Sequence, residues 1–183
     1  MLLWGAAPLD GAIYGTVYAG HRPALVTVAR GFTALGEPTY LVVASAGCAL
    51  WLWYAGRVRL GIVLLLIVTI GRGLAEVQKY WVARARPVLE PHLVAVKTSS
   101  FPSGHAANSM IFYLSLALAL SAGTRWQRPA CAAALLLSLL IGWSRVALGV
   151  HWPSDVIGGW AFGLLWVLLT LKPTERLLDA DSR

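Results

Sequence analysis

Five long apolar segments limit what this chain can fold into. They cover residues 38–55, 60–77, 105–122, 129–146 and 156–171. A helix needs about 20 mainly apolar residues to cross the hydrocarbon core of a bilayer. A spanning segment must also satisfy its backbone hydrogen bonds internally, which a helix does. The sequence therefore predicts an all-α fold, an integral membrane helical bundle with five clear spans.

The segment before these five, residues 9–35, gives a weaker signal. Charged or helix-breaking residues interrupt it at Asp10, His21, Arg22, Pro23 and Arg30. It is either an amphipathic helix at the interface or a poor first span, and we favour an interfacial or steeply tilted helix. The bundle would then have about six helices. No internal repeat or linker divides the chain, so we expect a single membrane-embedded domain over residues 1–183.

The composition excludes an ordinary soluble domain. Of the 183 residues, 58% are hydrophobic and only 13% are charged, and the mean hydropathy is +0.67. A soluble chain of this length lacks the polar residues to cover so much apolar surface. Cys48 and Cys131 lie inside apolar segments and indicate neither a disulfide framework nor a metal site. The first residues lack a basic start and a clear cleavage site, so we expect no cleaved signal peptide.

The net charge of +7 favours lipid headgroups and an anionic substrate, not nucleic acid, as partners. The basic residues form no long run and lie at the ends of apolar segments. Alternation of the spans places one set of basic residues on the same side: Arg57, Arg59, Arg125, Arg128, Lys172 and Arg176. Residues 79–101 and 149–155 fall on the other side. Short basic loops favour the cytoplasm, so we expect an inner (cytoplasmic) membrane protein whose other face meets the periplasm or cell exterior.

Lys79 and Arg86-Pro87 form the first of three polar motifs. Lys79 and Arg86 are seven residues apart, or two helical turns, so both face the same way if the helix continues past the membrane. Arginine offers a planar fork of donors for phosphate oxygens, and lysine adds a compact charge. The alternative is an ordinary basic flank at the end of a span.

The second motif, Pro102-Ser103-Gly104-His105, lies where a polar loop turns into an apolar helix. Free backbone N–H groups at a helix start, a hydroxyl and a glycine provide a seat for an anion. His105 stands at its mouth, where an imidazolium can hand a proton to a leaving oxygen. The alternative is a serine cap followed by a histidine that anchors at the interface.

The third motif is the sharpest: Ser144-Arg145, five residues, His151, three residues, then Asp155. Pro153 suits the first turn of a new helix. A carboxylate near that turn can accept a hydrogen bond from one imidazole nitrogen and leave the other free to attack. The alternative is a helix-capping aspartate beside a chance histidine.

Together the three motifs closely resemble those of the type 2 phosphatidic acid phosphatase superfamily. Every position of the pattern matches, and the motifs span residues 79–155. The resemblance implies that His151 is the nucleophile of a phosphohistidine intermediate, oriented by Asp155, and that His105 protonates the leaving group and then helps to activate water. It implies phosphoryl-binding roles for five residues: Lys79, Arg86, Ser103, Gly104 and Arg145. It implies no metal and no other cofactor.

The roles of several further polar residues stay open. Arg84 either extends the phosphate site or flanks it. Arg72 and Glu76, four apart within a span, are expected to form an internal ion pair, with a lipid-headgroup contact as the alternative. Asn108 and Ser109 are candidates for lining the cavity.

The function implied by the resemblance is hydrolysis of a membrane lipid phosphate. Undecaprenyl diphosphate is the preferred substrate, with phosphatidylglycerol phosphate, phosphatidate and lipid A phosphate as alternatives, because no motif residue discriminates among lipid tails. A vanadium-dependent haloperoxidase shares the anion pocket, but such relatives are soluble. An inactive lipid-binding or transport protein is the alternative of another class, and the presence of both histidines argues against it. The sequence makes no prediction of oligomeric state.

Overall fold

The computed structural model describes residues 8–179, with side chains described as far as Thr170. This part of the chain is all-helical, which confirms the predicted fold class. The seven helices in order are α1 (Pro8–Val17), α2 (Pro23–Leu35), α3 (Pro38–Tyr54), α4 (Val58–Val82), α5 (Gly104–Ser121), α6 (Gln127–Ala147) and α7 (Pro153–Asp179).

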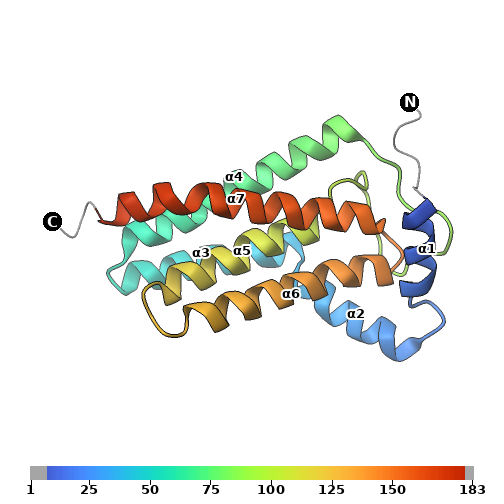
Figure 1. Cartoon of the computed structure of the whole chain (residues 1–183), viewed down its shortest axis with the longest axis horizontal. Coiled ribbons are helices and arrows are strands. Elements are labelled where there is room, and N and C mark those ends of the chain that lie inside the picture. Colours follow the sequence, from blue (N-terminus) through green and yellow to red (C-terminus); the bar gives the residue numbers. More distant parts are fainter. Residues whose placement is uncertain (1–7, 180–183) are drawn as a thin grey trace.

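The N-terminal segment forms two helices where the sequence predicted one. A turn separates α1 from α2, and Pro23 occupies the first turn of α2, where its missing N–H costs no hydrogen bond. Helix α1 lies across one end of the bundle and contacts α6 and α7 (Figure 1). Helices α2 and α3 are joined at Gly36 and Glu37 with a bend of 45°.

All five predicted spans are helices, α3 to α7. Three of them, α4, α6 and the described part of α7, are long and apolar enough to cross a membrane on their own. The bent pair of α2 and α3 makes a fourth if it counts as one span. Helix α5 is the most buried, because it packs against α4, α6 and α7. Its side chains face protein, so it carries polar residues that a lipid-facing helix would not tolerate.

Two glycines of α7 allow this helix to approach α5 closely. Gly159 and Gly163 are four residues apart and therefore share one face of the helix. A Cβ added to Gly159 would lie 2.6 Å from the Ser103 carbonyl oxygen, and one on Gly163 would lie 2.8 Å from the Ala107 carbonyl oxygen. The missing side chains thus let the backbones meet, as small residues do in membrane helix pairs. This packing brings the start of α7 beside the start of α5.

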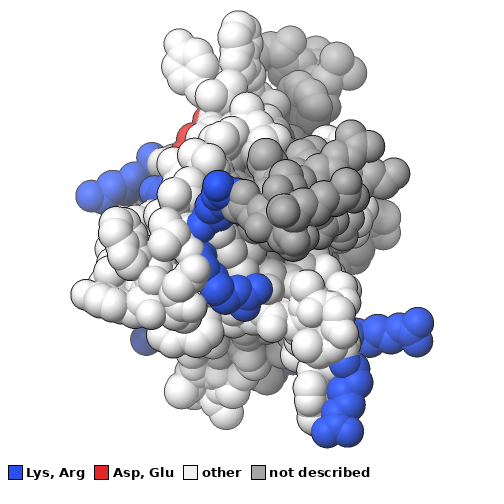
Figure 2. All heavy atoms as spheres, turned by 90° about the vertical axis from the view of Figure 1, so that its left-hand side faces the viewer, with Lys and Arg blue, Asp and Glu red and all other residues white. Residues whose placement is uncertain are grey.

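The bundle has two chemically different ends. At one end lie the C-termini of α4 and α6, the N-termini of α5 and α7, and α1 (Figure 1). The opposite end, viewed in Figure 2, carries projecting basic side chains. The α3–α4 connection places exposed Arg57 and Arg59 there, and the α5–α6 connection places Arg125 and Arg128 there. The side chains of Lys172 and Arg176, predicted for the same side, lie outside the described residues.

Candidate active site

The three motifs meet at the end of the bundle covered by α1. Lys79 is in the last turn of α4, Arg145 is in the last turn of α6, and Gly104 begins α5. His151 lies in the short connection from α6 to α7. The Ser103 backbone N–H donates to the Asp155 carbonyl oxygen at 2.9 Å, which ties the second motif to the third.

His151 is fully buried and its two ring nitrogens face different groups. Nδ1 lies 3.5 Å from Asp155 Oδ2. Nε2 lies 3.2 Å from Arg86 Nη1. A guanidinium nitrogen can only donate, so Nε2 is the acceptor of this contact and the proton of the neutral ring belongs on Nδ1. The ring therefore presents an unprotonated Nε2 to the cations and a protonated Nδ1 to the carboxylate.

Burial and nearby cations lower the pKa of His151. The ring is 1% exposed. Loss of hydration is the largest cause, and the positive charges of Arg86, Arg145 and Lys79 add to it, so the pKa lies well below its ordinary value of 6.5. The imidazole is consequently neutral at physiological pH, which is the state that a nitrogen nucleophile requires.

The loop before α5 holds the cations of the first motif. Lys79 Nζ donates to Thr98 Oγ1 and to the Ser99 carbonyl oxygen, both at 3.3 Å. Arg86 Nε donates to the Thr98 carbonyl oxygen at 2.8 Å. Helix α4 ends at Val82, and Ala83 adopts a left-handed conformation with φ 46°. The predicted two-turn alignment of Lys79 and Arg86 on one helix is therefore wrong, and the loop brings them together.

Several polar atoms at this end have no hydrogen-bond partner within the described residues. They are Arg84 Nε, Ser103 Oγ, His105 Nε2, Arg145 Nε and both side-chain atoms of Asn108. Ser103 stands at the N-cap of α5 but its side chain makes no cap hydrogen bond, so a plain serine cap does not describe it. Buried polar groups normally have partners. Their unused hydrogen-bonding capacity suits a polar ligand.

His105 and Arg145 also contact the helices before α4. His105 Nε2 lies 3.5 Å from Glu37 Oε2, at the bend between α2 and α3. Arg145 Nη1 donates to Thr33 Oγ1 of α2 at 2.6 Å. The site thus extends beyond the three motifs into the N-terminal third of the chain.

The sequence did not single out Asp10 or Ser100. Ser100 Oγ donates to Asp155 Oδ2 at 2.5 Å. Arg84, for which a phosphate-binding or a flanking role was left open, lies 2.6 Å from Asp155 Oδ1 and 2.8 Å from Asp10 Oδ2. Asp10 entered the prediction only as an interruption of an apolar segment. A charge in such a segment requires a buried partner, and this was the available signal.

Arg72 does not form the predicted ion pair with Glu76. Its Nη1 donates to the Pro38 carbonyl oxygen at 3.1 Å, and Glu76 is exposed. Pro38 lies in the first turn of α3, directly after the bend. Its carbonyl oxygen is therefore within reach of Arg72 on α4. The arginine is therefore partnered by backbone.

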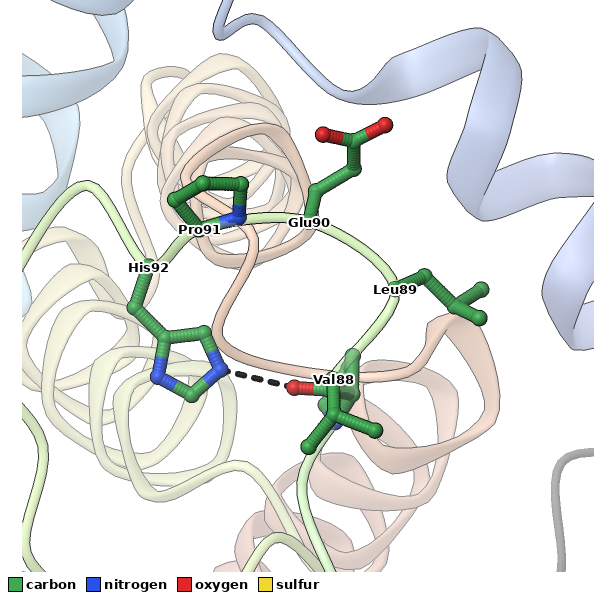
Figure 3. A pocket seen from close by; sticks show the side chains of 6 residues that line it. Val88, Leu89, Glu90, Pro91 and His92 are labelled. Atoms are coloured by element: carbon green, nitrogen blue, oxygen red, sulfur yellow. Dashed lines mark hydrogen bonds between the residues drawn. The ribbon is translucent and has the colours of Figure 1, made fainter.

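A cavity of about 420 Å³ lies in the loop that follows Arg86. Of the motif residues, Pro87 lines this cavity, and the proposed catalytic and phosphate-binding residues do not. Figure 3 shows the His92 ring beneath the loop, with its Nε2 2.7 Å from the Pro87 carbonyl oxygen. This contact stabilises the loop after the first motif. Within the described part of the chain, no three His, Cys, Asp or Glu side chains are grouped to hold a metal ion.

The apolar helical bundle and the cations around a buried histidine define a membrane protein of the phosphatase class. The family model of the PAP2 superfamily matches residues 60–177. The chain therefore belongs to the PAP2 superfamily, which confirms the resemblance seen in the motifs.

Named relatives agree with this assignment. Phosphatidylglycerophosphatase B of Bacillus subtilis (strain 168) is 32% identical over 172 residues, 92% of this chain and 84% of the relative. An undecaprenyl-diphosphatase of Sulfolobus acidocaldarius is 35% identical over 120 residues, 63% of this chain and 55% of the relative. The crystal structure of a transmembrane PAP2-type phosphatidylglycerolphosphate phosphatase from Bacillus subtilis has a TM-score of 0.81 at 32% identity, covering 92% of this chain and 85% of that chain. The chain is a phosphoric ester hydrolase, a lipid phosphatase of PAP2 type.

Proposed function

We propose that the protein removes a phosphoryl group from a membrane lipid through a phosphohistidine at His151. The observation that carries this proposal is the environment of the ring. Nε2 is unprotonated beside Arg86, and Nδ1 faces Asp155. An imidazole in that state can attack phosphorus, and the carboxylate stabilises the positive charge that develops on the ring.

The first step forms the Nε2–P bond and breaks the bond between phosphorus and the leaving oxygen. His105 donates the proton that this oxygen needs, and Glu37 supplies a counter-charge to the protonated ring at 3.5 Å. In the second step water attacks phosphorus, His105 accepts its proton, and the N–P bond breaks to release phosphate. The phosphoryl oxygens are bound by Lys79, Arg86, Ser103, Gly104 and Arg145. Positioning and charge stabilisation are the main demands of phosphoryl transfer.

We infer that the substrate is phosphatidylglycerol phosphate, with undecaprenyl diphosphate, the preference from sequence, as the second candidate. The relative named for the first lipid aligns over 92% of this chain. The relative named for the second aligns over 63%. Both substrates keep their tails in lipid and their phosphate in water, which suits a site at the end of a helical bundle.

We also propose that the protein resides in the inner membrane with the site facing the periplasm or cell exterior. Arg57, Arg59, Arg125 and Arg128 gather at the end opposite the motifs. Short basic loops favour the cytoplasm.

Phosphate release from detergent-solubilised protein tests the function. Phosphatidylglycerol phosphate, undecaprenyl diphosphate, phosphatidate and a lipid A phosphate are compared, with His151→Ala as the matched inactive protein. We expect the variant to lose at least about 10³-fold in kcat, as removal of a nucleophile does. Near-normal turnover by folded His151→Ala would exclude the proposed nucleophile. Rapid-quench detection of an acid-labile phosphoprotein in the wild type, absent from the variant, identifies the intermediate.

A further inference from the structure

Behind Asp155 lies a buried row of charges that the three motifs do not include. Asp10 of α1, Arg84 of the α4–α5 loop and Asp155 of α7 are 5%, 7% and 0% exposed. Arg84 bridges the two carboxylates, with Nη1 2.6 Å from Asp155 Oδ1 and Nη2 2.8 Å from Asp10 Oδ2. Three segments far apart in the sequence therefore share one ionic network.

The network fixes both oxygens of the Asp155 carboxylate. Oδ1 accepts from Arg84, while Oδ2 accepts from Ser100 Oγ at 2.5 Å and from the Trp152 backbone N–H at 2.9 Å. A carboxylate bound on both oxygens cannot rotate freely. Its Oδ2 is thereby held 3.5 Å from Nδ1 of His151.

Asp10 stabilises this arrangement from the outer side. Its Oδ1 accepts from the Ser154 backbone N–H at 2.9 Å, and its Oδ2 accepts from Ser154 Oγ at 2.5 Å. Ser154 is in the first turn of α7, directly before Asp155, so Asp10 also caps the helix that carries the carboxylate.

Charge balance explains why Arg84 needs Asp10. Lys79, Arg86 and Arg145 already place three cations around the site. A fourth buried cation shared by a single carboxylate would leave Asp155 fully neutralised. With Asp10 included, two carboxylates flank one guanidinium and the row carries a net charge of minus one toward the His151 ring, whereas removal of one partner leaves an uncompensated buried charge.

We propose that Asp10 and Arg84 are positioning residues for the nucleophile, acting through Asp155 to orient and charge-balance the His151 ring. This proposal rests on the proposed function of His151. It makes α1 part of the active site, although α1 lies before the region that the family model matches.

Steady-state kinetics of Asp10→Asn and Arg84→Lys in the full-length protein tests the proposal. Asp10→Asn keeps an acceptor for Ser154 but removes the charge, and Arg84→Lys keeps the charge but removes the fork that spans two carboxylates. We expect each to lower kcat roughly 10- to 100-fold, the range of one charge-assisted hydrogen bond. KM and the inhibition constant of inorganic phosphate should stay within about twofold, because no anion-binding residue changes.

Half-buried Glu90 and exposed Lys97, both in the α4–α5 loop, provide matched controls. Glu90→Gln removes a carboxylate that lines the loop cavity of Figure 3, outside the ionic row, and Lys97→Gln removes an exposed cation. Both should keep the kcat of the wild type. In the double variant Asp10→Asn/Arg84→Gln, the loss should not exceed that of Arg84→Gln alone, because both residues act through one network.

The outcomes separate the two proposals. Wild-type kcat in Asp10→Asn or Arg84→Lys overturns the positioning role while leaving the phosphatase intact. A raised inhibition constant for phosphate in Arg84→Lys would indicate that Arg84 binds the anion directly. This result also contradicts the positioning role. Absence of lipid phosphatase activity in the wild type is the failure of the proposed function itself. If Asp10→Asn does not fold, the kcat of Arg84→Lys, which retains the positive charge, tests the positioning role in its place.

Discussion

The amide of Asn108 is buried beside the motifs without a hydrogen-bond partner among the described residues. Asn108 is 4% exposed, and neither Nδ2 nor Oδ1 is bonded. Nδ2 lies 3.9 Å from the position that a Cβ on Gly104 would take, and Lys79 Nζ lies 3.8 Å from the same point. An unpaired buried amide costs about 1–3 kcal/mol. We expect a bound anion to recover this cost by accepting a hydrogen bond from Nδ2.

Replacement of Asn108 by leucine should therefore raise the stability of the folded protein and lower its affinity for phosphate. In Asn108→Leu we expect the midpoint of thermal unfolding to rise by a few degrees, as about 1 kcal/mol gives in a protein of this size. The inhibition constant of inorganic phosphate should increase about tenfold, because a neutral donor is lost. Ser115→Ala removes another buried, unpartnered group of α5 and is the control, with a similar thermal shift and no change for phosphate. Unchanged phosphate inhibition in Asn108→Leu would exclude a role in binding.

The lowered pKa of His151 predicts an unusual pH profile. Attack requires the neutral ring, and kcat/KM reports the ionisation of the free enzyme. Because burial and three cations depress the pKa, kcat/KM should fall only as the pH drops through a value well below 6.5. Arg86→Gln removes one of those cations and should move this acid limb to higher pH. The profiles must be corrected for the second ionisation of the phosphate ester, near pH 6. An acid limb centred at 6.5 in the wild type would contradict the buried environment of the ring.

The sequence could predict the site residues that share short motifs, but not the residues that support them. The spacing of His151 and Asp155 indicated an imidazole backed by a carboxylate, and the structure places the two 3.5 Å apart. Asp10 could not be assigned in this way, because its partner Ser154 is 144 positions away. The separation of two charged residues in the sequence does not predict whether they will be in contact in the folded protein.

At the scale of the helices, the length of each apolar segment predicted where the helices lie. The positions at which the backbone leaves the helical conformation were predicted less well. The five apolar segments correspond to α3 to α7. The N-terminal segment was harder to predict, because the turn before Pro23 divides an otherwise apolar stretch into α1 and α2. Helix α4 extends beyond the predicted span of residues 60–77 but ends at Val82, where Ala83 is left-handed, so it does not continue as far as Arg86.

The close approach of α5 and α7 gives a prediction for Gly159. Its Cβ would lie 2.6 Å from the Ser103 carbonyl oxygen, a backbone atom that cannot move aside alone. Gly159→Ala should therefore lower the free energy of unfolding by about 1–3 kcal/mol, as overpacking does. It should also lower kcat, because Ser103 lies at that contact and its backbone N–H donates to the Asp155 carbonyl oxygen. Gly73→Ala on α4 is the matched control, with open space around its Cβ and a neutral or slightly favourable effect expected. Thermal unfolding in detergent measures both, and equal stability of the two variants would show that the helices are not in contact there.

At the scale of the whole molecule, the separation of the two ends predicts the orientation in the membrane. Single cysteines at positions 90 and 125 can be introduced into a protein with Cys48 and Cys131 changed to alanine. We expect a membrane-impermeant thiol reagent to label position 90 in intact cells and position 125 only after permeabilisation, because the basic end faces the cytoplasm. The reverse pattern would place the motifs on the cytoplasmic side. Equal labelling at both positions in intact cells would show that the two ends do not lie on opposite sides.

The hydrogen bonds between α1 and the start of α7 join segments that are synthesised at different times. Asp10 precedes its partner Ser154 by 144 positions, and Ser154 belongs to α7, which follows the other described helices in the chain. Contacts so distant in the chain form late. We therefore expect a nascent chain that contains both histidines but has not yet inserted α7 to hydrolyse little, because Asp155 and its partners are not in place.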